Sequence, residues 1–253
     1  MTVSDTLVYR KGPTVDRGWG MAESAEHEQP LDGEAASARR RATRARLMEA
    51  ASAEIVERGY HATTIEHIAE RAGFTRGAFY SNFDSKEQLF AEALDAGRKA
   101  LLLDLDARLA ASELPADLDL RSDAGAVERA VDHILRGLPK EPSWWVLNVE
   151  ADLLAVHDRD FAARTRDSAS RFLDDIGALV ERTVGDFGFR LAIEPGQVVR
   201  VLFGYFSTAL REAVLGGRGT APWLADPRQT RTVARLLLAM LEPKDQSDSA
   251  PPR

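Results

Sequence analysis

Hydrophobic residues recur at helical spacing along most of this 253-residue chain, and no segment shows the sustained alternation of a β-strand. The spacing predicts seven longer helices, at residues 42–60, 84–111, 124–138, 141–157, 160–187, 195–215 and 226–241. Two shorter helices are predicted between residues 63 and 83. Residues 112–123 contain a proline and several acidic residues, and we expect them to form a linker. The pattern therefore predicts an all-α chain.

The two short helices are joined by a tight turn. Thr63 has the side chain of a helix N-cap and Glu66 follows three residues later, the spacing of a capping box. Gly73 follows the last periodic residue, where a left-handed residue often ends a helix. Thr75 is placed to cap the second helix, beneath which we expect three aromatic side chains to pack, those of Phe74, Phe79 and Phe83. This arrangement is typical of a helix-turn-helix, whose second helix enters the major groove of DNA.

Two features around this motif suit contacts with DNA. The outward face of the second motif helix carries hydroxyls, an arginine and a glycine, from Thr75, Arg76, Gly77, Tyr80 and Ser81. Upstream, five arginines and no acid lie between residues 39 and 46, at Arg39, Arg40, Arg41, Arg44 and Arg46. They form either a solvated basic tail or an arm on DNA phosphates or the minor groove, and the motif that follows favours the arm. Farther on, Asp84 and Glu87 repeat the capping-box spacing and predict the start of the next helix.

Residues 41–94 resemble the N-terminal domain of the TetR family of bacterial transcriptional regulators. The resemblance rests on short motifs in a fixed order. They are Gly59-Tyr60, Thr63-Thr64, Ile68-Ala69, Ala72-Gly73, Thr75-Arg76-Gly77-Ala78, Tyr80 with Phe83, and Ser85-Lys86-Glu87 with Leu89. The match covers about a fifth of the chain.

The resemblance implies roles for individual residues. Thr64, Tyr80 and Lys86 would bind phosphates of double-stranded DNA, and residues 75–77 would meet base edges or adjacent phosphates. Asn82 stands where the family often carries histidine. The full set of expected DNA-binding residues is Arg41, Arg44, Thr64, Thr75, Arg76, Gly77, Tyr80, Ser81, Asn82 and Lys86.

The resemblance also implies a division into domains. We expect a three-helix DNA-binding head at residues 39–89 and a larger helical domain at residues 90–241, which holds an effector and dimerises. Residues 1–38 and 242–253 are rich in small, polar and charged residues, and we expect both to be disordered. Translation could start at either Met1 or Met21.

In that family the last two helices form the dimer interface, here about residues 196–215 and 226–241. Their wide apolar faces fit either a homodimer or packing inside one subunit. An unknown small-molecule effector is expected among the aromatic residues and one amide, at Trp144, Trp145, Asn148, Phe172, Phe203 and Phe206. The same aromatics could instead be plain core. Glu150 and His157 either set ligand polarity or belong to a solvated face.

Composition narrows the remaining possibilities. The formal net charge is −7, but residues 39–98 hold ten basic and nine acidic residues, so the head can present a basic surface despite the acidic chain. The chain has no cysteine, which fits a reducing cytoplasm. No apolar run approaches the ~20 residues that span a membrane. We therefore expect a cytoplasmic protein that makes no membrane contact.

The sequence does not favour an enzyme. Its five histidines are scattered, and no phosphate-cradling glycine loop or Gly-x-Ser-x-Gly motif is present. We therefore expect no catalytic residues, metal site or cofactor. The favoured function is repression at a palindromic DNA operator, with release when a small molecule binds the C-terminal domain. The alternatives are a helical protein-interaction module, and a regulator that activates or acts without a ligand.

Overall fold

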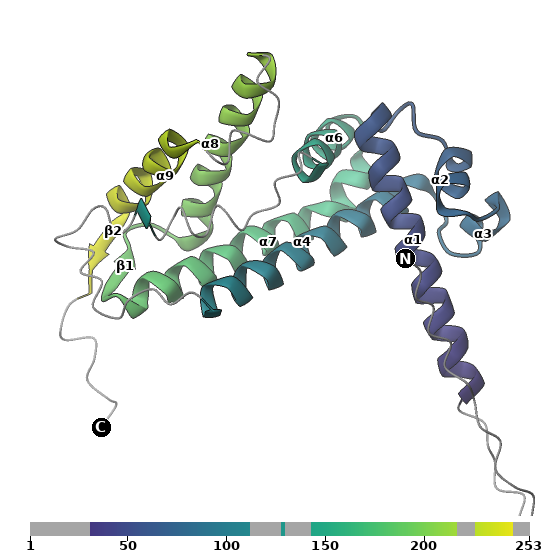
Figure 1. The fold of residues 1–253 in the computed structure, drawn as a ribbon, viewed down its shortest axis with the longest axis horizontal. Coiled ribbons are helices and arrows are strands. Elements are labelled where there is room, and N and C mark those ends of the chain that lie inside the picture. Colours follow the sequence, from purple (N-terminus) through teal and green to yellow (C-terminus); the bar gives the residue numbers. More distant parts are fainter. Residues whose placement is uncertain (1–30, 112–127, 130–142, 217–225, 245–253) are drawn as a thin grey trace, which may run out of the picture. The chain divides into compact units, whose positions relative to one another are not determined.

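The computed structural model describes residues 31–111, 128–129, 143–216 and 226–244. These ranges contain eight helices and two short strands (Figure 1). The elements are α1 (Leu31–Arg58), α2 (Ile65–Ala72), α3 (Arg76–Tyr80), α4 (Lys86–Ala111), α6 (Ser143–His157), α7 (Arg159–Asp186), β1 (Phe189–Leu191), α8 (Pro195–Leu215), α9 (Pro227–Ala239) and β2 (Leu241–Pro243). The expectation of a helical fold with a helix-turn-helix head is confirmed.

Helix α1 begins at Leu31, eleven residues before the predicted start at residue 42 and eight residues inside the range expected to be disordered. Residues 34–41 consist of glutamate, alanine, serine and arginine, most of them good helix formers, so the helix extends without an apolar stripe to mark it. The chain divides into two units between residues 39 and 40, and the contacts described below lie within the second. Residues 1–30 and most of the predicted helix at 124–138 lie outside the described residues.

The two strands pair antiparallel, with Leu191 opposite Leu241 and Phe189 opposite Pro243. Phe189 and Leu191 are buried against Val184 and Val198. Strand β2 thus includes the first two residues of the tail that was expected to be disordered. Each strand has only three residues, which is too short for an alternating pattern to be recognised in the sequence.

The head has its own apolar core. Helices α1, α2 and α3, the start of α4 and the loop before it contribute fully buried side chains, which include Leu47, Ile68, Phe79, Phe83 and Leu89. Because this core is contributed by all four elements, it fixes α3 firmly on α1 and α2.

In the C-terminal part, α4 and α7 lie side by side and α8 packs on α7 (Figure 1). Their shared core includes Leu101, Phe172, Ile176 and Val199. Gly177 allows α7 and α8 to approach closely, since a Cβ there would lie 2.6 Å from the carbonyl carbon of Pro195 at the start of α8.

A second cluster joins the head to the C-terminal helices. Ile55 and Tyr60 pack with Phe90 of α4, Leu154 of α6 and Phe161 of α7. The Tyr60 and Phe90 rings stack with centroids 5.3 Å apart, and those of Phe90 and Phe161 stack 5.6 Å apart. Aromatic packing therefore runs without a break from the end of α1 into α7.

Candidate nucleic-acid interface

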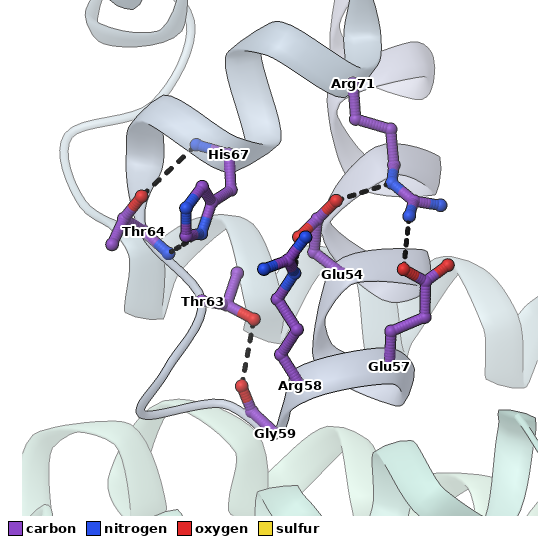
Figure 2. Close-up of polar contacts among 8 residues, drawn as sticks. All are labelled: Glu54, Glu57, Arg58, Gly59, Thr63, Thr64, His67 and Arg71. Atoms are coloured by element: carbon purple, nitrogen blue, oxygen red, sulfur yellow. Dashed lines mark hydrogen bonds and ion pairs between the residues drawn. The ribbon is translucent and has the colours of Figure 1, made fainter.

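Helix α2 begins one residue later than predicted. Its N-cap is Thr64, whose hydroxyl accepts a hydrogen bond from the His67 backbone N–H at 3.2 Å, while the His67 Nδ1 accepts from the Thr64 backbone N–H (Figure 2). Thr63 is only 1% exposed, and its hydroxyl donates to the Gly59 carbonyl at 2.9 Å. The predicted capping box of Thr63 and Glu66 is therefore wrong. The Thr63 hydroxyl bonds to Gly59 at the end of α1, and Thr64 and His67 form the capping box instead.

The turn and the start of α3 agree with the prediction. Gly73 has a left-handed conformation with φ of 71°. The Thr75 hydroxyl caps α3 by accepting from the Ala78 N–H at 3.2 Å. Phe79 is fully buried beneath the helix. The head therefore holds α3 with its polar face outward.

Six of the expected DNA-binding residues are exposed on α3 and the N-terminus of α2: Thr64, Thr75, Arg76, Gly77, Tyr80 and Ser81. Arg76 forms an ion pair with Glu66 at 2.6 Å, and its guanidinium carbon lies 5.6 Å from the centre of the Tyr80 ring. The hydrogen bond to the Tyr80 hydroxyl and the charge of Glu66 raise the pKa of Arg76. A charged, forked donor thus stands on the exposed face of α3, beside a competing carboxylate.

The arginine segment is split. Arg39, Arg40 and Arg41 are exposed. Arg44, however, donates to the Asn82 carbonyl, pairs with Glu92, and lies 4.1 Å over the Phe83 ring.

Two neighbours of Arg44 are also turned toward the head. Arg46 donates to the Ala72 carbonyl at 2.8 Å and lies over the Phe74 ring. The side-chain amide of Asn82 donates to the Ala78 carbonyl at 2.8 Å. Arg44 and Arg46 thus both bind groups of the head, although Arg46 stays exposed, and neither simply continues the exposed segment 39–41.

Lys86 is also turned inward. Its ammonium donates to the carbonyls of Tyr60 at 2.8 Å and Thr63 at 2.7 Å, and lies 4.0 Å from the centre of the Tyr60 ring. Burial lowers the pKa of Lys86. A lysine ammonium has three donors, so these two bonds leave one N–H that could point elsewhere.

The start of α4 differs by one residue from the predicted cap. The Ser85 hydroxyl accepts from the Gln88 N–H at 3.1 Å, and the Gln88 side chain accepts from the Asp84 N–H at 2.7 Å. Glu87 accepts instead from the Tyr60 hydroxyl at 2.6 Å. The predicted Asp84 and Glu87 box is therefore wrong, because Glu87 is taken by a tertiary contact.

A charge cluster ties α1 to α2, and the sequence pattern did not reveal it. Glu54, almost completely buried, lies 2.6 Å from the Arg71 Nε and 2.8 Å from the Arg58 Nε, and Arg71 also pairs with Glu57 at 2.5 Å (Figure 2). Burial raises the pKa of Glu54, but the Arg71 hydrogen bond and the charges of both arginines outweigh it, so the pKa is lowered. The cluster fixes the angle at which α2 leaves α1.

The structure brings together the aromatic residues proposed to hold an effector. Trp144 lies 4.9 Å from Trp145 and 5.8 Å from Phe203, measured between ring centroids. Phe172 and Phe206 complete this cluster and are nearly buried. The Asn148 amide donates to the Trp144 carbonyl at 2.8 Å within α6.

A cavity of about 130 Å³ between α4 and α7 lies beside this cluster and is lined by Arg98, Ser168 and Phe172 among others. Glu150 lies elsewhere, because its carboxylate accepts from the Tyr60 N–H at 2.8 Å. His157 is exposed at the end of α6.

The last two helices use much of their apolar surface inside the subunit. Val198, Phe206 and Ala209 of α8 and Val233 of α9 are buried. Val201 of α8 is 46% exposed.

Within the described ranges, no group of three or more histidine and carboxylate side chains could hold a metal ion. No helix in the same ranges is long and apolar enough to cross a membrane.

Comparison with known proteins places the head in a family. The family model for bacterial regulatory proteins of the tetR family matches residues 47–93. The uncharacterized HTH-type transcriptional regulator YdgC of Bacillus subtilis is 44% identical over 52 residues, which are 21% of this chain and 27% of that protein. The HTH-type transcriptional regulator TtgR of Pseudomonas putida is 46% identical over 54 residues, 21% of this chain and 26% of its own length. The chain thus matches about a quarter of the length of these relatives.

The similarity in structure extends farther than the similarity in sequence. A TetR transcription regulator from Haloarcula marismortui superposes with a TM-score of 0.57 over 79% of this chain and 98% of its own, at 21% identity. At that identity the comparison shows a shared fold. The chain therefore carries a tetR-family domain at residues 47–93 and has the fold of a TetR regulator.

Proposed function

We propose that this chain is a sequence-specific DNA-binding transcriptional regulator that represses at a palindromic operator. The observation that carries the proposal is the exposed polar face of α3, held on a head with its own apolar core. Residues 39–89 would form the DNA-binding domain, and residues 90–241 would bind an effector and dimerise. The proposal places the protein in the cytoplasm and assigns it no catalytic role.

The exposed residues have distinct tasks in this proposal. Arg76 reads a base edge, because a guanidinium can bind guanine through two hydrogen bonds. Residues Thr75, Gly77, Tyr80 and Ser81 contact neighbouring bases and phosphates. Thr64 lies at the N-terminus of α2, where backbone N–H groups and the helix dipole favour a phosphate. Before Arg76 can reach a base, its ion pair with Glu66 must open or shift.

The inward residues act through the position of α3. Arg44 and Asn82 hold the end of α3 against α1, so we assign them to the geometry of the reading head. Arg41 is exposed and remains our candidate for a phosphate contact beside the motif. Lys86 could reach a phosphate only through its third N–H.

A homodimer through α8 and α9 would place two reading heads on two half-sites, about 34–36 Å apart for one turn of DNA. The exposed Val201 supports this face, but α6 carries another exposed apolar stripe that includes Val149, which is 54% exposed. Val201→Asp and Val149→Asp separate the two faces. Analytical ultracentrifugation should give a monomer for the first variant and a dimer for the second, and the reverse result would move the interface to α6.

The effector would bind beside the aromatic cluster of Trp144, Trp145 and Phe203, with Phe172 shared by the adjacent cavity. The proposed release follows from α4, which begins in the head and continues alongside α7. A ligand that shifts the later part of α4 would change the separation of the two heads. Gly97 lies inside the continuous helix and is our candidate point of bending. Equal head separation in free and ligand-bound crystals would contradict this mechanism.

The first test is a gel shift of the purified protein on the DNA upstream of its own gene, with and without excess nonspecific DNA. A shift that survives the competitor would support the regulator and provide an operator. If binding disappears, selection from random-sequence duplexes follows. Failure of that selection to enrich any sequence would reject the proposed function and favour the alternative of a protein-interaction module.

A further inference from the structure

Just after the end of α1, one backbone N–H has no acceptor in its own helix and is bound by a side chain of α6. Gly59 has φ of 81°, and its N–H donates to the Ile55 carbonyl at 2.8 Å. This is the simple left-handed cap, in which the next N–H makes no bond to its own helix. The next N–H belongs to Tyr60, and it donates to the Glu150 carboxylate of α6 at 2.8 Å.

Helix α2 provides an internal comparison. It also ends at a left-handed glycine, but there the Gly73 N–H donates to Glu70 at 3.0 Å and the Phe74 N–H donates to Ala69 at 2.8 Å. Both donors are satisfied within the helix, in the arrangement of a Schellman motif. The end of α1 therefore differs from the end of α2 by its dependence on a charged side chain 90 residues away.

Charged and aromatic groups bind the ring, the hydroxyl and both backbone polar groups of Tyr60. It is 3% exposed; its carbonyl accepts from Lys86 and its hydroxyl donates to Glu87. Its ring stacks on Phe90. Because Glu150 takes the remaining backbone donor, the turn is clamped from α4 and from α6 together.

This turn leads directly into the reading head. The Lys86 ammonium that binds the Tyr60 carbonyl also binds the Thr63 carbonyl at 2.7 Å, and Thr64 is the N-cap of α2. A shift of Tyr60 would therefore move the first turn of α2, and α3 is packed on α2. Glu150 is followed by Ala151, which is buried in the same cluster as Tyr60, so α6 is anchored there by packing as well.

We propose that Glu150 is a positioning residue for DNA binding, which transmits the position of α6 to the start of α2. This proposal rests on the proposed function as a regulator. It assigns to Glu150 no contact with DNA and none with an effector.

The test compares Glu150→Ala and Glu150→Gln with wild type in the full-length protein, with Glu181→Ala on the exposed face of α7 as a control. The DNA is a duplex selected with the wild-type protein from a random pool. Losing the carboxylate should weaken binding about tenfold, as expected for a lost hydrogen bond to a charged group. The slope of affinity against salt should stay unchanged, because no phosphate contact is removed. The amide oxygen of Gln can still accept from Tyr60, so Glu150→Gln should retain most of the affinity.

Amide hydrogen exchange gives a readout that does not need DNA. In Glu150→Ala, exchange should accelerate at Tyr60 and across the first turn of α2, while amides in the α7 and α8 core stay protected. Unchanged exchange at Tyr60 would overturn the proposal, and so would faster exchange with unchanged affinity. If wild type selects no sequence, the proposed function fails, and exchange in the first turn of α2 still decides whether Glu150 positions it.

Discussion

Replacing Lys86 with methionine separates two roles that one lysine can have. Met keeps an unbranched apolar stem of similar length but removes the ammonium. In the structure this ammonium is bound to the carbonyls of Tyr60 and Thr63, whereas the family resemblance assigns it to a DNA phosphate. We expect Lys86→Met to lower the free energy of unfolding of the head. The salt dependence of DNA binding should change little.

The size of the effect follows from the lost contacts. A hydrogen bond to a charged group contributes about 1.5–3 kcal/mol, and Lys86 makes two. Because Lys86 is only half-buried, water would replace part of both bonds, which brings their joint contribution to about 2 kcal/mol. The cation over the Tyr60 ring adds about 0.5–1 kcal/mol. Burial of the charge, which lowers the Lys86 pKa, offsets part of this, so the net loss is about 2 kcal/mol, which corresponds to a Tm lowered by roughly 4–8 °C in a chain of this size.

Urea and thermal unfolding followed by circular dichroism would measure this change. Lys99→Met is the matched control, since Lys99 is exposed on the same helix, and its stability should stay within about 0.5 kcal/mol of wild type. If Lys86→Met were as stable as this control, the clamp reasoning would be refuted. A salt slope lower by about one with unchanged stability would assign Lys86 to a phosphate instead.

Three further changes test other parts of the structure. Arg76→Ala should alter the preferred operator sequence and cost about 1–3 kcal/mol of binding if it contacts guanine; an unchanged preference in selection from random duplexes would move Arg76 to the DNA backbone. Because the Glu54 pKa is lowered by its arginine partners despite burial, this carboxylate stabilises the fold fully above about pH 4.3, its pKa when unfolded, and loses that contribution as pH falls through the lowered pKa. Glu54→Gln should therefore be less stable at pH 7, with a deficit that shrinks in acid unfolding curves; a constant deficit would contradict the assignment. Gly177→Ala should cost about 1–3 kcal/mol by steric clash with the start of α8, whereas Gly97→Ala, which meets nothing within 4 Å, should unfold at equal or higher urea concentration.

Much of the fold could be predicted from the sequence because helical periodicity is a local signal. Helices α4, α6, α7, α8 and α9 begin and end within two residues of the predicted bounds. The N-terminus of α1 could not be placed in this way. Its first turns carry no apolar stripe, so hydrophobic periodicity could not mark a helix there, although most of its residues favour one.

The direction of polar side chains was harder to predict than the helices that carry them. Thr63 and Thr64 are identical in chemistry, and only the bond from Thr63 back to Gly59 decides which of them caps α2. Glu150 was recognised as a polar position in α6, but its partner is a backbone N–H 90 residues earlier. Such contacts depend on how distant elements meet, which local spacing does not contain.

The ion pair between Glu66 and Arg76 bears on how fast such a protein finds its site. On random DNA, Arg76 would leave the Glu66 carboxylate and bind a phosphate. This exchange gains little free energy, because each of the two exposed ion pairs contributes less than about 1 kcal/mol. A guanine that offers two acceptors at once is a better partner than the carboxylate. In the proposed function, the pair would therefore lower the residence time on wrong sequences more than on the right one. Glu66 would let the protein release quickly while it searches and stay bound once the operator is reached.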